Sequence, residues 1–78
     1  MRPRATHSKH FVDLDGVKYI VLFRRVNGFW QGRVGLFNGK GNDPKEAFEF
    51  GDVSHQHPND RTAEELVIQY ERIKARDE

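Results

Sequence analysis

Three runs rich in hydrophobic residues lie in the first half of the chain, and two short turns separate them. The runs read HFVDL, VKYIVLFRRV and FWQGRVGLF, with Asp15-Gly16 and Asn27-Gly28 between them. Asp-Gly and Asn-Gly are typical of two-residue type I′ hairpin turns, because both central residues of that turn need positive φ. The middle run is rich in β-branched and aromatic residues, which favours a central strand. The pattern predicts three antiparallel strands between His10 and Phe37.

The two turns also predict which residues share a face of the sheet. Counting outward from each turn pairs Val12 with Tyr19 and Phe23 with Gly32, and directly opposed residues lie on the same face. One face then holds Val12, Leu14, Val17, Tyr19, Val21, Phe23, Trp30, Val34 and Leu36. This face is apolar, and we expect it to form the core. Gly32 is expected to leave room for a large neighbouring side chain.

The second half of the chain adds a fourth strand and a helix to the prediction. KEAFEFGDVS, residues 45–54, alternates apolar and polar positions and predicts a short strand. TAEELVIQYERIKARDE predicts a helix whose first residues, Thr62 and Glu65, would form a capping box. Its apolar stripe consists of Ala63, Leu66, Val67, Tyr70 and Ile73. We therefore predict an α+β fold, an antiparallel β-meander of three to four strands with one C-terminal α-helix packed on one face.

Length and composition indicate the size of this domain and the cellular compartment in which we expect it. At 78 residues, with 36% hydrophobic and 32% charged residues, the chain has room for one small domain at the polar end of the globular range. Residues 1–9 show no apolar periodicity and are expected to be a flexible basic tail, which leaves residues 10–78 as the domain. The sequence has no Cys, no apolar run of membrane-spanning length and no secretory signal pattern, so we expect a cytoplasmic protein.

Charge is distributed unevenly along the chain. Residues 1–40 contain eight Lys and Arg and two acids, a net charge of +6, whereas residues 41–78 contain five bases and ten acids, a net charge of −5. Either the halves neutralise each other across the fold, or the basic half faces an anionic partner.

Three short patterns resemble catalytic or ligand-binding motifs without meeting their requirements. GLFNGKG lacks the glycine spacing and the Ser or Thr of a phosphate-binding loop. Asp52, Ser54 and His55 are residue types of a catalytic triad, yet they lie too close in sequence to meet around a substrate. His55 and His57 are weak candidates for a metal site, because a polar loop before the helix accounts for them without a ligand. We expect no enzymatic activity, no cofactor and no bound metal.

The face opposite the predicted core mixes apolar and basic side chains. It holds Phe11, Asp13, Lys18, Ile20, Leu22, Arg24, Val26, Phe29, Gln31, Arg33 and Phe37. One helix covers only one face of a sheet, and a small protein rarely exposes this much apolar surface without a use. We select Phe29, Arg33, Phe37, Arg24, Ile20 and Lys18 as candidate binding residues.

Two kinds of partner fit these residues. Aromatic residues and arginine are enriched where proteins meet, so we expect a protein partner or self-association. The alternative is single-stranded nucleic acid, whose bases stack on aromatic rings and whose phosphates pair with cations. A third possibility is that the tail, the fourth strand or the loop at residues 51–61 covers this face.

The order of elements is similar to that of a known group of DNA-binding domains. FWQGRV followed later by a helix beginning TAEEL resembles the small three-strand-plus-helix domains at the amino ends of phage-type tyrosine integrases, over residues 17–75. The resemblance implies a sheet that enters the DNA major groove. The net charge of +1 and the acidic helix depart from that group, and no functional residue is carried over from it.

Overall fold

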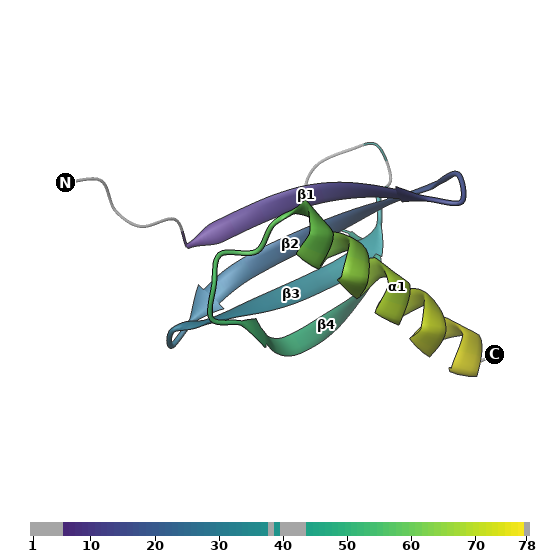
Figure 1. Ribbon diagram of the computed structural model, residues 1–78. Helices are drawn as coiled ribbons and strands as arrows, with labels where there is room; N and C mark the ends of the chain where they lie inside the picture. The colour runs from purple at the N-terminus through teal and green to yellow at the C-terminus, as the bar shows by residue number, and fades with distance from the viewer. Residues whose placement is uncertain (1–5, 38, 40–43, 78) are drawn as a thin grey trace.

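The computed structural model describes residues 6–37, 39 and 44–77, and it confirms the predicted α+β fold (Figure 1). Four antiparallel strands form one open sheet in the order β1-β2-β3-β4: β1 His7–Leu14, β2 Val17–Val26, β3 Phe29–Leu36 and β4 Lys45–Ser54. The helix α1, Asp60–Asp77, lies across one face of this sheet. The fourth strand distinguishes the sheet from the three-stranded one implied by the resemblance to integrase domains.

Both hairpin turns have the predicted backbone geometry. Asp15 and Gly16 have φ values of 53° and 79°, and Asn27 and Gly28 have φ values of 51° and 83°, so all four lie in the left-handed region that type I′ turns require. The strand pairing counted from these turns is confirmed at every predicted position, including Phe23 with Gly32.

The first strand begins earlier than the sequence indicated. Residues 7–9, which we assigned to the tail, pair with the far end of β2, from His7 opposite Arg24 to Lys9 opposite Leu22. The backbone N–H of Arg25 also donates a hydrogen bond to the carbonyl of Thr6, at 2.9 Å. The reason is that β2 is longer than the predicted first strand. Its remaining backbone N–H and C=O groups pair with residues 7–9. Residues 1–5 of the predicted tail lie outside the described residues.

The core lies between the sheet and α1 and has the predicted composition. Its buried residues are Val12, Tyr19, Val21, Phe23, Trp30, Val34, Ala63, Leu66, Val67 and Tyr70, with Leu14, Leu36, Phe50 and Val53 packed at its border. Val17 and Ile73 are the exceptions: Val17, the first residue of β2, sits beside the turn and remains exposed, and Ile73 of the predicted helix stripe is only half-buried and lies outside this core. The tyrosine hydroxyl of Tyr19 donates a hydrogen bond to Glu71 of α1. Burial, together with this hydrogen bond, raises the pKa of Tyr19, so the hydroxyl stays protonated as a donor.

Gly32 leaves room for large neighbouring side chains, as predicted, and one of these neighbours belongs to the helix. A Cβ atom on Gly32 would lie 2.6 Å from Cδ1 of Leu66 and 3.3 Å from Cε1 of Phe23. No side chain fits at this position without displacing one of these neighbours. The glycine therefore lets the first half of α1 approach β3 closely.

The helix begins two residues before the predicted start, and its cap differs from the predicted one. The side-chain oxygen of Asn59 accepts a hydrogen bond from the N–H of Thr62 at 3.0 Å, and the Thr62 hydroxyl accepts one from the N–H of Asn59 at 3.4 Å. This reciprocal arrangement is a capping box with Asn59 in the cap position. Thr62 is therefore in the first turn of the helix, and Glu65 instead lies 3.9 Å from Arg61.

Candidate functional site

The sheet face opposite α1 is called here the outer face, and within the described residues no helix lies over it (Figure 1). Strand pairing aligns its residues in rows that run across the sheet. One row holds His7, Arg24 and Gln31, the next holds Lys9, Leu22, Arg33 and Glu49, and a third holds Phe11, Ile20 and Gly35. Asp52 pairs with Gln31 between two register shifts and lines the groove between β4 and α1. Because directly paired residues point the same way, each row is a set of adjacent side chains on this one face.

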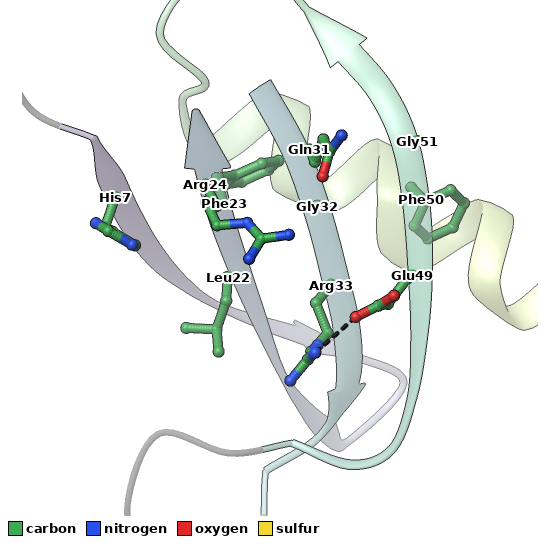
Figure 2. Close-up of a pocket in the computed structure, with 10 residues that line it drawn as sticks. All are labelled: His7, Leu22, Phe23, Arg24, Gln31, Gly32, Arg33, Glu49, Phe50 and Gly51. Atoms are coloured by element: carbon green, nitrogen blue, oxygen red, sulfur yellow. Dashed lines mark hydrogen bonds and ion pairs between the residues drawn. The ribbon is translucent and has the colours of Figure 1, made fainter. Parts of the chain in front are cut away.

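Most residues of the first two rows, together with Phe50 and Gly51 of β4, line a groove of about 460 Å³, whereas Lys9 does not line it. Figure 2 shows Arg24 and Arg33 reaching over the strands beside Gln31, with His7 on the β1 side and Glu49 on the β4 side. Leu22 supplies apolar surface to the same groove. The groove thus offers hydrogen-bond donors, both signs of charge and an apolar contact, which is the mixture typical of a protein interface.

The two predicted arginines of the groove have different surroundings. Arg33 forms an ion pair with Glu49, with Nη2 2.6 Å from Oε1, and this hydrogen bond holds the pKa of Glu49 below its usual range. The side chain of Arg24 is exposed and makes no hydrogen bond or ion pair to any residue that the structure describes. Of the two arginines, Arg24 is therefore the one that is available to an incoming anionic group.

Ile20 is the candidate binding residue that the structure contradicts. Its relative exposure is 0%, although it lies on the predicted face. It sits in the middle of the sheet between Phe11 and Gly35, and the rings of Phe11 and Phe37 meet beside it with centroids 5.0 Å apart. Larger neighbouring side chains cover this central position. Ile20 is therefore buried within the outer face and offers no surface to a partner.

The other candidate residues remain accessible to different degrees. Lys18 is exposed, whereas Phe29 and Phe37 are half-buried, so parts of both rings remain accessible. The most exposed large apolar side chain of the face is Phe11, at 52%. The apolar surface is therefore concentrated on Phe11 and Phe37, toward the end of the sheet with the Asp15-Gly16 turn.

The loop before α1 covers the opposite end of the sheet. The ring of His55 lies on Phe29 with centroids 4.1 Å apart, and the ring of His57 lies on Trp30 with centroids 4.9 Å apart. Phe29 and Trp30 are consecutive in β3 and point to opposite faces. The two imidazoles are thus separated by the strand and do not converge on one ion, which removes the basis for pairing them as metal ligands. Within the described part of the chain, no group of three potential ligand side chains comes together.

A hydrogen-bonded relay that the sequence analysis did not identify joins β1 to the start of α1. Nδ1 of His10 lies 2.7 Å from a carboxylate oxygen of Asp60, and Nε2 lies 2.7 Å from the hydroxyl of Ser8. A carboxylate only accepts, so Nδ1 of His10 donates to Asp60, and in the neutral form of the imidazole Nε2 then accepts from the Ser8 hydroxyl. The His10 ring also packs edge-on against Phe23, with centroids 5.5 Å apart.

Serine, histidine and aspartate in this order are the residue types that activate a nucleophile in hydrolases. Here the His10 side chain is 13% exposed and Asp60 is 93% exposed, and Ser8 lines neither the outer-face groove nor the second groove between β4 and α1. Neither of these two grooves is therefore a substrate pocket for the Ser8 hydroxyl. It does fasten the edge strand β1 to the helix, which is a sufficient structural role for all three groups.

The sequence contained a signal for part of this relay. Extending the pairing back from the Asp15-Gly16 turn places His10 opposite Val21 and Ser8 opposite Phe23, on the core face. The partner Asp60 is 50 residues away from His10, and no local pattern indicates that contact.

Comparison with known proteins gives no independent indication of function. The chain matches no protein-family model, no curated protein and no solved structure. Among the described residues, no helix combines the length and apolar character needed to cross a bilayer.

Proposed function

We propose that this chain is a small, non-enzymatic interaction module that binds a protein partner, or another copy of itself, through its outer face. A cytoplasmic location fits its lack of cysteine. The observation that carries the proposal is the groove of about 460 Å³ on the sheet face opposite α1, beside the exposed ring of Phe11. Exposed apolar surface bordered by charged and polar groups is typical of protein interaction sites.

Nucleic-acid binding is the alternative, and specific contacts make it the weaker one. Arg24 and Lys18 are exposed cations on the outer face and favour an anionic ligand. The charge of Arg33 is offset by Glu49, however, and the ring of Phe29 is engaged by His55. Base stacking needs open aromatic faces and phosphate binding needs uncompensated cations, so both requirements are only partly met.

An NMR titration of the ¹⁵N-labelled protein tests the proposal. The probes are unlabelled protein of the same sequence, poly-glutamate as an acidic polypeptide, and single-stranded oligonucleotides. We expect the amides of Leu22, Arg24 and Arg33 to shift with at least one polypeptide probe, while residues on the exposed side of α1 do not shift.

Two results would contradict the proposal. One is that neither polypeptide probe shifts the outer-face amides. The other is that oligonucleotides shift them at lower concentration and with a steep dependence on salt, since phosphate contacts release counterions. The second result would replace the protein partner with nucleic acid.

The absence of enzymatic activity is tested at the Ser8–His10–Asp60 relay. We expect a fluorophosphonate, which labels activated serines, to modify Ser8 no more than the matched control Ser54, because Ser8 lies outside both grooves. The measurement is the mass of each serine-containing peptide after exposure to the reagent. A Ser8 adduct that disappears in both His10→Gln and Asp60→Asn variants would show instead that the relay activates the hydroxyl.

A further inference from the structure

The groove on the outer face contains more positive than negative charge. Its lining holds two guanidinium groups, those of Arg24 and Arg33, against one carboxylate, that of Glu49, so its net charge is +1 with His7 neutral. Arg33 is the arginine that pairs with Glu49, whereas the side chain of Arg24 forms no ion pair with any described residue. One incoming carboxylate would therefore neutralise the groove.

The three charged groups lie close enough to act as one site. The hydrogen bond from Arg33 is the main cause of the lowered pKa of Glu49, and the charge of Arg24 lowers the same pKa to a smaller extent. Figure 2 shows the guanidinium of Arg24 extending from β2 toward β3, beside Gln31 and near the ion pair. Arg24 thus adds its charge to the ion pair without being part of it.

The groove crosses the sheet from one edge strand to the other. Its lining includes His7 of β1, Leu22 and Arg24 of β2, Gln31 and Arg33 of β3, and Glu49 and Gly51 of β4. Neighbouring strands lie about 4.8 Å apart, so the distance from β1 to β4 is about 14 Å. An extended polypeptide advances about 3.3 Å per residue, so about four residues fit along the groove.

The polar groups of the groove match a polypeptide better than a nucleic-acid backbone. Gln31 both donates and accepts hydrogen bonds, whereas Glu49 only accepts them, so the groove also needs donors from its ligand. A polypeptide supplies backbone N–H donors, and an acidic side chain supplies a carboxylate for Arg24. A phosphodiester backbone has acceptors only, and it would bring further negative charge against Glu49.

We propose that the groove binds an acidic segment of a partner protein, about four residues long, which lies across the strands and places a carboxylate on Arg24. This inference rests on the proposed function and specifies the chemistry of its partner. The surroundings of the groove have the same sign of charge, because the described outer-face residues beyond it include Lys9 and Lys18 against Asp13. An acidic partner is therefore attracted toward the whole face.

Two matched peptides test the inferred ligand in an NMR titration of the ¹⁵N-labelled protein. One is tetraglutamate and the other is tetraglutamine, both capped at their ends and added at low salt, where charge interactions are least screened. We expect tetraglutamate to shift the amides of Leu22, Arg24 and Arg33. Tetraglutamine should bind about fivefold more weakly or less, because it has the same length and no carboxylates.

Two substitutions in the groove should change the affinity for tetraglutamate in opposite directions. Arg24→Gln removes the excess positive charge and should weaken binding by about fivefold. Glu49→Gln removes the competing carboxylate from Arg33 and should strengthen binding by about twofold or more. Arg72→Gln, on an exposed part of α1, is the matched control and should bind as the wild type does. Circular dichroism checks that each variant retains the fold.

Other outcomes overturn the inference. It fails if the two peptides bind equally, if Arg24→Gln binds tetraglutamate as the wild type does, or if inorganic phosphate shifts the same amides at an equal or lower concentration. If tetraglutamate does not shift them but unlabelled protein or poly-glutamate does, the inference fails and the proposed function stands. If no polypeptide probe shifts them, both fail. Oligonucleotides that shift them at lower concentration than any polypeptide would replace both with nucleic-acid binding.

Discussion

Replacing Leu66 with alanine is expected to lower the free energy of unfolding by about 2–5 kcal/mol. Leu66 is buried in the core and its Cδ1 reaches into the space above Gly32, so truncation leaves a cavity that α1 cannot close without moving. Small domains have total stabilities of about 5–15 kcal/mol, so the loss is a large share of the whole. Urea denaturation followed by circular dichroism measures it.

Ile68→Ala provides the matched control for this change. Ile68 lies on the same helix, two residues further along, but it is 41% exposed. We expect Ile68→Ala to cost less than about 1 kcal/mol, because much of its side chain is already in contact with water. Equal losses for the two variants would show that α1 does not present Leu66 to the sheet.

Replacing Gly32 with valine is expected to be destabilising by about 1–3 kcal/mol or more, for the opposite physical reason. A Cβ atom there meets Leu66 Cδ1 at 2.6 Å and Phe23 at 3.3 Å, and valine adds two further methyl groups. Gly51→Val is the control, because a Cβ atom on Gly51 has no neighbouring atom within 4 Å. Thermal denaturation of the two variants should show a lower melting temperature for Gly32→Val alone.

Combining the two changes tests whether the contact is as close as described. In a Leu66→Ala background the space above Gly32 is partly vacated, so Gly32→Val should cost less than it does in the wild type. Strictly additive losses from the two substitutions would mean that residues 32 and 66 do not share this space.

Much of the sheet could be predicted because its register is specified locally. Asp15-Gly16 and Asn27-Gly28 each fix a two-residue turn, and a one-residue slip would move every apolar side chain to the wrong face. The space at Gly32 followed from the same register, which placed a residue without a side chain opposite Phe23, whereas the approach of Leu66 depends on where α1 packs.

The parts that sequence reasoning missed depend on contacts between distant segments. Ile20 was assigned to the exposed surface because alternation reports which face a residue occupies, and not how deeply its neighbours cover it. The stacking of His55 on Phe29 depends on the path of a loop that has no periodicity. The helix start differs from the predicted one because Asn59 and Thr62 are both residues that favour cap positions. Which of them caps the helix depends on the path of the preceding loop.

Because every strand pairs with its neighbour in sequence, the sheet can assemble one hairpin at a time. Each hairpin closes only a short loop, so the entropy lost at each step is small, and sheets with local pairing fold faster than those with distant pairing. The docking of α1 is different, since its contact with β1 joins residues as far apart as His10 and Asp60. A chain emerging from the ribosome can therefore form its hairpins early, but it cannot bury its core until α1 has also emerged.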